Sequence, residues 1–200
     1  MNENSFGNKI PNIEIPKVPE KGRQEKLDLK IEVAGPEDWK IVRDLRVEAI
    51  TGPDARMFGL TKKGTIQESN RSEQEWRDEL SGDKTFAVLS WSGSNPVGFG
   101  RAILREDGAW RIRNGYVKNE FRGVGIGEQI FKMRLDEIRR RGGKQVITSI
   151  RPDNLGSLHI AEKFGFKPIS TINVAMSSLQ NRLFKKGFTH LYLDLEQDNK

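Results

Sequence analysis

The 200-residue sequence contains no cysteine and only two histidines, His159 and His190. The lack of cysteine excludes disulfide bonds, thiolate zinc sites and cysteine nucleophiles, and two histidines leave little material for a metal site or a histidine relay. The chain also lacks an apolar run long enough to cross a bilayer, and its N-terminus lacks the apolar segment of a signal peptide. We therefore expect a soluble, cytoplasmic protein with no metal and no membrane partner.

The charge balance is moderately basic, with 34 Lys and Arg against 28 Asp and Glu. Residues 1–25 carry both signs equally, so the positive surplus lies in the rest of the chain. Such a surplus suits an anionic ligand, a nucleic acid or neither. The cluster Arg139–Arg141 ends a predicted helix, where cations complement the helix dipole. Because no recognition helix or interleaved aromatic pattern accompanies it, we expect no nucleic-acid partner.

The sequence divides into an arm, one domain and a tail. Residues 1–25 contain three prolines and no sustained period of 2 or 3.6, which predicts a disordered arm. Residues 26–195 form the predicted domain, and residues 196–200 form a short tail. A domain of this length buries enough surface to fold without a metal or a disulfide.

Hydrophobic periodicity predicts an α/β (α+β) domain in which helices cover a largely antiparallel sheet. Gly35-Pro36 opens a first helix, and the capping box Ser72–Glu75 opens a second. A long helix follows a glycine-rich corner at 122–127 and ends near Arg141, and a short helix spans Asn154–Phe164. The predicted strands are the alternating segment 27–33, Thr85–Ser90, Val97–Leu104, Trp110–Val117, Val146–Ile150, Phe166–Ile172 and Phe188–Leu195.

The glycine-rich corner is the most informative segment. Residues 116–127 read Tyr-Val-Lys-Asn-Glu-Phe-Arg-Gly-Val-Gly-Ile-Gly and run from a strand into a helix. Glycines at such a junction let main-chain N–H groups and the helix dipole face a pyrophosphate. The corner lacks the Gly-Lys-Ser/Thr of a P-loop and the spacing of a dinucleotide fingerprint. Taken alone, it is equally compatible with a tight turn that binds nothing.

Further motifs follow the corner in a fixed order. The corner Arg122-x-x-Gly125-x-Gly127 is followed by Asn154-x-x-Ser157 and then by Lys163-Phe164-Gly165-Phe166. This order resembles the GNAT (Gcn5-related N-acetyltransferase) superfamily, in its generic bacterial branch. The earlier segments 45–50 and 53–59, with Trp76, also resemble that branch. The resemblance spans residues 28–195 and implies a mixed, mostly antiparallel sheet of six to seven strands with helices on both faces.

The resemblance implies acetyl-CoA as cosubstrate and assigns residues to it. The main chain of the corner would hold the pyrophosphate, and the Val117 N–H would polarise the thioester carbonyl. Asn154 and Ser157 would contact the CoA, although Asn154 is equally well explained as a helix N-cap. The implied cofactor-binding residues are Val117, Arg122, Gly123, Val124, Gly125, Ile126, Gly127, Asn154 and Ser157.

Two departures from the family pattern leave the catalytic residues unknown. The strand 110–117 carries no carboxylate to act as general base, and Ala161 occupies the usual position of the tyrosine general acid. His159 lies two residues from Ala161, about 200° around the helix. We therefore expect His159 on the surface.

Several polar side chains are candidates for acceptor recognition. Strict alternation places Arg111 and Arg113 on one strand face with Val117. If this face lines the acceptor site, the arginines favour a substrate with a carboxylate or phosphate; otherwise they are simply exposed. His190, Tyr192 and Asp194 share the face of the last strand opposite its leucines and border either the acceptor site or solvent.

These features predict an acetyl-CoA-dependent N-acetyltransferase that acts on a primary amine by direct attack in a ternary complex. The acceptor is a small molecule or a peptide amine, and a homodimer is compatible with the resemblance. The alternative is a catalytically weakened CoA-binding module with a regulatory or binding role, suggested by Ala161 and the missing carboxylate. An interaction protein that uses its N-terminal arm is a third, weaker interpretation.

Overall fold

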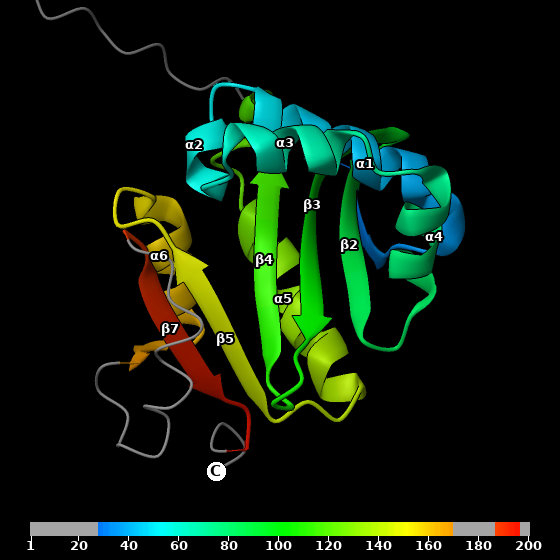
Figure 1. The fold of residues 1–200 in the computed structure, drawn as a ribbon. Helices are drawn as coiled ribbons and strands as arrows, with labels where there is room; N and C mark the ends of the chain where they lie inside the picture. Colours follow the sequence, from blue (N-terminus) through cyan, green and yellow to red (C-terminus); the bar gives the residue numbers. More distant parts are fainter. Residues whose placement is uncertain (1–27, 170–186, 197–200) are drawn as a thin grey trace, which may run out of the picture.

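The computed structural model describes residues 28–169 and 187–196. Their strands form one seven-stranded sheet in the order β1-β2-β3-β4-β5-β7-β6 (Figure 1). All neighbouring strands are antiparallel except β4 and β5, which are parallel. The strands are β1 (Leu29–Val33), β2 (Thr85–Ser92), β3 (Asn95–Leu104), β4 (Trp110–Val117), β5 (Gln145–Ile150), β6 (Lys167–Pro168) and β7 (Thr189–Asp194).

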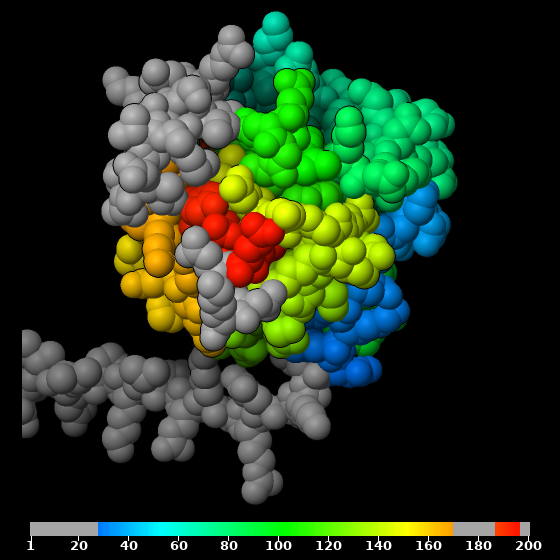
Figure 2. Space-filling view, turned by 90° about the horizontal axis from the view of Figure 1, so that it is seen from below, coloured from blue at the N-terminus to red at the C-terminus, as the bar shows by residue number. Residues whose placement is uncertain are grey.

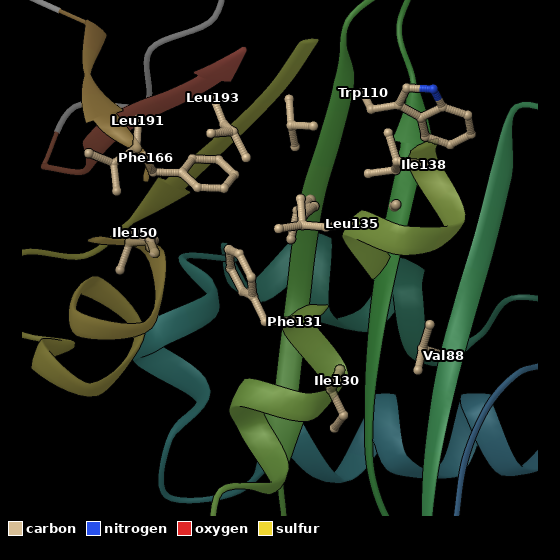
Figure 3. Close-up of a cluster of buried hydrophobic side chains, with 14 of the residues drawn as sticks. Val88, Trp110, Ile130, Phe131, Leu135, Ile138, Ile150, Phe166, Leu191 and Leu193 are labelled. Atoms are coloured by element: carbon tan, nitrogen blue, oxygen red, sulfur yellow. The ribbon is translucent and has the colours of Figure 1, made fainter. Parts of the chain in front are cut away.

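Helices cover both faces of the sheet, as predicted. Helices α1 and α4 pack on one face through a core that includes Val42, Trp76 and Phe99. Helices α5 and α6 pack on the other face, where Ile130, Phe131 and Leu135 of α5 point at the sheet (Figure 3). The helices are η1 (Pro36–Asp38), α1 (Trp39–Thr51), α2 (Ala55–Phe58), α3 (Lys62–Ser69), α4 (Glu73–Ser81), η2 (Asn119–Phe121), α5 (Ile126–Arg140) and α6 (Leu155–Lys163).

Local sequence signals explain where most elements begin. The Ser72 hydroxyl accepts the Glu75 N–H at 3.3 Å and the Glu75 carboxylate accepts the Ser72 N–H at 2.7 Å, so the predicted capping box starts α4. The short helices α2 and α3 were not predicted, because neither has a sustained apolar stripe. None of the described helices is long and apolar enough to cross a membrane.

Some predictions fall on residues outside the described ranges. The predicted arm 1–25 lies outside them, as does the predicted tail except Glu196. The predicted strand Phe166–Ile172 is described as far as residue 169 and contains β6. Next to β6 in the sheet, β7 lies between α6–β6 and the connection from α5 to β5 (Figure 2). There the Leu195 N–H donates to the Lys144 carbonyl at 2.8 Å.

A β-bulge in β4 overturns the strict alternation that the sequence suggested. Asn114 has a φ of 58°, and the β3–β4 register shifts between Phe99 and Arg101. The extra residue reverses which side chains face α5. Val117 therefore packs with the core on the α5 face, whereas Arg113 lies opposite Arg101 on the other face. The prediction that Val117 shares a face with Arg111 and Arg113 is wrong for this reason.

A buried arginine of α5 holds the bulge from one side. Arg134 is 3% exposed, and its Nη1 donates to the Arg113 carbonyl at 3.3 Å. A Cβ added at Gly100 would lie 2.9 Å from the Arg134 guanidinium, so the glycine makes room for it. Burial lowers the pKa of Arg134 to about 9. The helix and the bulge are thus coupled by one side chain.

Candidate active site

The two parallel strands β4 and β5 diverge along the sheet. They pair at only three positions, from Trp110–Val146 to Ile112–Thr148. Beyond Ile112 and Thr148 the strands separate toward α2 and α6 (Figure 1). The last five residues of β4 therefore present a main-chain edge that β5 does not pair.

Val117 directs its main-chain polar groups toward this separation. It lies opposite Gly98 in the β3–β4 register, and the next residue, Lys118, donates its N–H to the Val97 carbonyl at 2.9 Å. In an antiparallel ladder, a pair flanked by hydrogen bonds in this way makes none of its own. The N–H and C=O of Val117 therefore point away from β3 and toward β5. This orientation leaves the Val117 N–H available to a ligand between the two strands.

The glycine-rich corner follows β4 and leads directly into α5. Gly123 and Gly125 have φ values of 80° and 85°, a conformation that favours glycine. Gly125 is the N-cap of α5, and no side chain caps the helix there. The first N–H groups of α5, from Ile126 and Gly127 onward, lack intrahelical acceptors. The corner thus places a row of main-chain donors at the positive end of a helix.

The space in front of the corner is open. A Cβ added at Gly125 would have no atom within 4 Å. A Cβ at Gly127 would lie 3.6 Å from Ile160 of α6 and 3.9 Å from Val117. Gly127 therefore sits between β4 and α6, whereas Gly125 faces outward.

Arg122 connects the corner to the end of β4 and to the segment before α2. Its Nε donates to the Val117 carbonyl at 2.8 Å, and its Nη2 donates to Asp54 at 2.7 Å. The side chain is thus engaged within the protein, and its contribution to the corner is to fix the loop against β4. Val124 packs against the core cluster from the same loop.

Helix α6 follows β5 and lies close to the corner, where Ile160 is near Gly127. Asn154 caps the helix by accepting the Ser157 N–H at 3.2 Å, and Ser157 is half-buried. Lys163 pairs with Glu128 in the first turn of α5 at 2.7 Å. Ala161 is completely buried in the core, so this position has no room for a tyrosine ring without displacing its neighbours. His159 is exposed, as predicted.

A carboxylate of α1 lies at the opposite face of β4, and the sequence analysis did not identify it. Tyr116 donates its hydroxyl to Glu48 of α1 at 2.7 Å. Burial and the adjacent Glu48 raise the pKa of the Tyr116 phenol above its ordinary value. The two residues are 68 positions apart, and no local pattern links them. Alternation along the strand directs Tyr116 away from Val117, but no sequence pattern identifies its partner.

A buried ion-pair network extends over the same face from α1 to β3. Arg46 of α1 donates to Glu68 of α3 at 3.0 Å, and Arg101 of β3 donates to the same oxygen at 2.8 Å. Arg101 also pairs with Glu79 of α4, which pairs with Arg71 at 2.6 Å. Burial, together with neighbouring Arg101 and Arg113, lowers the pKa of Arg46 to about 10, although Glu68 opposes the shift.

The two arginines of β4 lie beside this network. Arg111 is half-buried and donates to Ser149 of β5 at 3.4 Å. Ser149 in turn is 2.8 Å from Nδ1 of His190 on β7. Arg113 is exposed and lies opposite Arg101. His190, Tyr192 and Asp194 are half-exposed while Leu191 and Leu193 are buried, so the predicted alternation of β7 is confirmed.

Comparison with known proteins shows which family this chain resembles. The model of the acetyltransferase (GNAT) family matches residues 54–166, which include the glycine-rich corner and α6. The search of curated protein sequences gave no significant match.

Solved structures share the fold at low sequence identity. The ribosomal-protein-alanine N-acetyltransferase from Brucella melitensis is 18% identical with a TM-score of 0.62, over 83% of this chain and 99% of that one. YncA from Salmonella typhimurium, solved with acetyl-CoA, is 17% identical with a TM-score of 0.62, over 84% and 94%. The PaiA N-acetyltransferase from Thermoplasma acidophilum, solved with coenzyme A, is 11% identical with a TM-score of 0.59, over 84% and 99%.

Proposed function

Because the chain belongs to the GNAT family of acetyltransferases, whose model matches more than half of it, we propose that it transfers an acetyl group from acetyl-CoA to a primary amine by direct attack in a ternary complex. The observation that carries this proposal is the contact between the end of β4 and the start of α5. The unpaired edge of β4 ends at Val117, and Arg122 holds Val117 against the open, uncapped N-terminus of α5.

The residues of the corner fit a pyrophosphate. Gly125 leaves open space in front of a helix N-terminus whose N–H groups lack acceptors, and both features attract an anion. The unpaired edge of β4 then offers main-chain groups to the pantetheine. In this proposal residues 122–127, Val117, Asn154 and Ser157 hold acetyl-CoA. Two of the structural neighbours were solved with CoA or acetyl-CoA, in line with this assignment.

The chain supplies two groups for the chemistry. When bound, acetyl-CoA supplies a thioester whose carbonyl carbon the amine attacks, with the CoA thiolate as leaving group. The Val117 N–H, which faces the separation between β4 and β5, donates to the carbonyl oxygen as negative charge develops on it. Glu48 of α1, which accepts a hydrogen bond from Tyr116 of β4, accepts the proton that the amine releases.

A CoA-binding module with weakened activity is the second candidate. The specific observation that favours it is Ala161, which is fully buried where the family's tyrosine general acid stands. A thiol of ordinary pKa, about 8.5, can leave as a thiolate at neutral pH at modest cost, about 2 kcal/mol, so the missing tyrosine is compatible with an active enzyme. Acetyl transfer, measured as thiol release, separates the two candidates.

The first experiment is a calorimetric titration of the protein with acetyl-CoA, with two glycine variants. Gly125→Glu places a carboxylate in front of the α5 N-terminus. Gly142→Glu is the matched control, because Gly142 also has a positive φ, of 74°, and open space for a side chain. It lies beyond the opposite end of the same 15-residue helix, about 22 Å away.

We expect binding by the wild type and by Gly142→Glu, and no binding by Gly125→Glu. Binding that survives in Gly125→Glu would place the ligand elsewhere and remove the support for the proposal. Where binding is confirmed, a panel of primary amines assayed for thiol release tests the transfer reaction itself.

A further inference from the structure

The face of the sheet opposite α5 holds a surplus of positive charge. Its ion-pair network joins residues of α1, α3, α4 and β3 with Arg71, which precedes α4. In the described part of the chain, the network contains three arginines and two glutamates: Arg46, Arg71, Arg101, Glu68 and Glu79. Both glutamates are shared between two arginines, and Arg113 of β4 adds a further positive charge beside them.

Arg113 lies beside this network and carries an unpaired charge. It is exposed, and its guanidinium forms no hydrogen bond or ion pair with any described residue. Its neighbours on the sheet are Arg101, directly opposite, and Arg111. Partial desolvation and these two positive charges lower the pKa of Arg113. Arg101 is already paired with Glu68 and Glu79, whereas Arg113 has no such partner, so an anion bound to Arg113 would relieve the remaining repulsion.

Arg46 supplies a second, independent observation. Its side chain is completely buried, and while its Nε is paired with Glu68, its Nη1 has no hydrogen-bond acceptor. A buried, charged donor without an acceptor is costly. The charges of Arg46 and Arg113 influence each other, so an anion held at Arg113 also lowers the electrostatic cost of Arg46.

The position of Arg113 relates this charge to the proposed reaction. Arg113 directly follows Ile112, the last residue of β4 that pairs with β5. It therefore lies where the two strands begin to separate, on the face that also carries Tyr116 and Glu48. An anionic group bound to Arg113 would hold a short amine near the proposed proton acceptor and the edge of β4.

We propose that the acceptor amine carries an anionic group, a carboxylate or a phosphate, which binds Arg113 in the positive field of Arg46, Arg101 and Arg111. This inference rests on the proposed function, because it names the substrate class of the same site. Arg113 is then the specificity-determining residue, and the buried network behind it keeps the site positive.

The test is a calorimetric titration of the CoA-loaded protein, which binds the acceptor without turnover, with two matched pairs of amines. β-Alanine is compared with propylamine, and phosphoethanolamine is compared with ethanolamine, so the two arms distinguish a carboxylate from a phosphate. Arg113→Gln removes the proposed contact. Arg43→Gln is the control, because Arg43 is a partly exposed α1 arginine paired with Asp44 and its loss changes the net charge equally.

We expect the anionic member of at least one pair to bind at least about tenfold more tightly than its neutral partner. Arg113→Gln should remove this preference and Arg43→Gln should keep it. Equal binding within both pairs, no binding of either anionic amine, or a preference that persists in Arg113→Gln would overturn the inference. Acetyl-CoA binding and thiol release are measured separately, so a protein that acetylates amines without preferring anionic ones retains the proposed function and loses only this inference.

Discussion

Glu48 and Tyr116 form a hydrogen-bonded pair immediately before the proposed oxyanion donor. Tyr116 precedes Val117 in β4, and alternation after the bulge directs its ring to the face of α1. Its hydroxyl donates to Glu48, so the phenol depends on that carboxylate for its position. A raised pKa keeps the phenol protonated near neutral pH, so it continues to donate to Glu48.

Replacing Glu48 with Gln should lower the rate of acetyl transfer while acetyl-CoA binding stays unchanged. The change keeps the shape and a hydrogen-bond acceptor for Tyr116 but removes the proton acceptor. Positioned general bases contribute roughly 100-fold or more, so we expect kcat to fall by about that factor. Steady-state thiol release and acetyl-CoA titration measure the two quantities.

Tyr116→Phe is the companion variant. It removes the hydroxyl but leaves the Glu48 carboxylate, so we expect a smaller loss of rate than in Glu48→Gln. A pH profile distinguishes a base from a structural role, because loss of the base should flatten the acidic limb of kcat. A Glu48→Gln enzyme with an unchanged rate and pH profile would exclude Glu48 as the proton acceptor.

At the scale of elements, Glu68 joins α3 to α1 and β3. One of its oxygens accepts from both Arg46 and Arg101, and its side chain is 20% exposed. Burial alone would raise the pKa of Glu68, but Arg101 and Arg46 outweigh it and lower the pKa below 4.5. Without this carboxylate, two largely buried guanidinium groups would lose a shared partner.

This arrangement predicts a pH-dependent contribution to stability. Because the pKa of Glu68 is lower in the folded than in the unfolded protein, its contribution is fully present above the unfolded value and is lost as the pH falls through the folded value. We expect Glu68→Gln to lower the free energy of unfolding by about 3 kcal/mol at neutral pH. The difference from the wild type should shrink below about pH 4.5. Urea denaturation across this pH range measures both quantities.

Glu162→Gln provides the control for this series. Glu162 is an exposed residue of α6, so the same chemical change should alter stability by less than about 0.5 kcal/mol. Other carboxylates titrate in both proteins and cancel in the difference. A Glu68→Gln deficit that stays constant from neutral to acidic pH would show that the network does not depend on the charge of Glu68.

At the scale of the whole molecule, hydrophobic periodicity and local caps were enough to predict the order of the main strands and helices. The capping box at Ser72 and the alternation of Leu191 and Leu193 are local signals, and the structure follows them. Helices α2 and α3 were missed because their residues carry no clear apolar period. The family resemblance supplied the strand count and the helices on both faces.

The candidate site likewise has one part that the local sequence predicts and another that depends on contacts between distant residues. The glycine corner is contiguous in sequence, so its position at the start of α5 could be predicted. The faces of β4 could not, because the bulge at Asn114 lies where Arg134 of α5 packs over Gly100 of β3, a contact between distant residues. The contacts of Glu48, of Glu68 and of Asp54 with Arg122 are likewise made across tens of residues.

The sheet as a whole consists of two parts with a limited connection. Strands β1 to β4 form one continuous antiparallel part, and β5, β7 and β6 form another. Between them, β4 and β5 pair at three positions, and α5 packs across the sheet toward α6. A ligand that occupies the separation between β4 and β5 therefore contacts both parts and opposes their separation during unfolding.

Acetyl-CoA at 100 times its dissociation constant should stabilise the fold by about 2.7 kcal/mol, which raises the Tm by roughly 5–10 °C for a chain of this size. Hydrogen exchange followed by NMR locates the effect. The Val117 amide should become protected when the ligand pairs with β4, whereas the Lys118 amide, already donated to Val97, should change only with global stability. Gly125→Glu should abolish both responses and Gly142→Glu should retain them. A Tm increase without selective protection of Val117 would mean that the ligand stabilises the protein from outside the β4–β5 separation, because only a ligand bound elsewhere would leave that edge free to exchange.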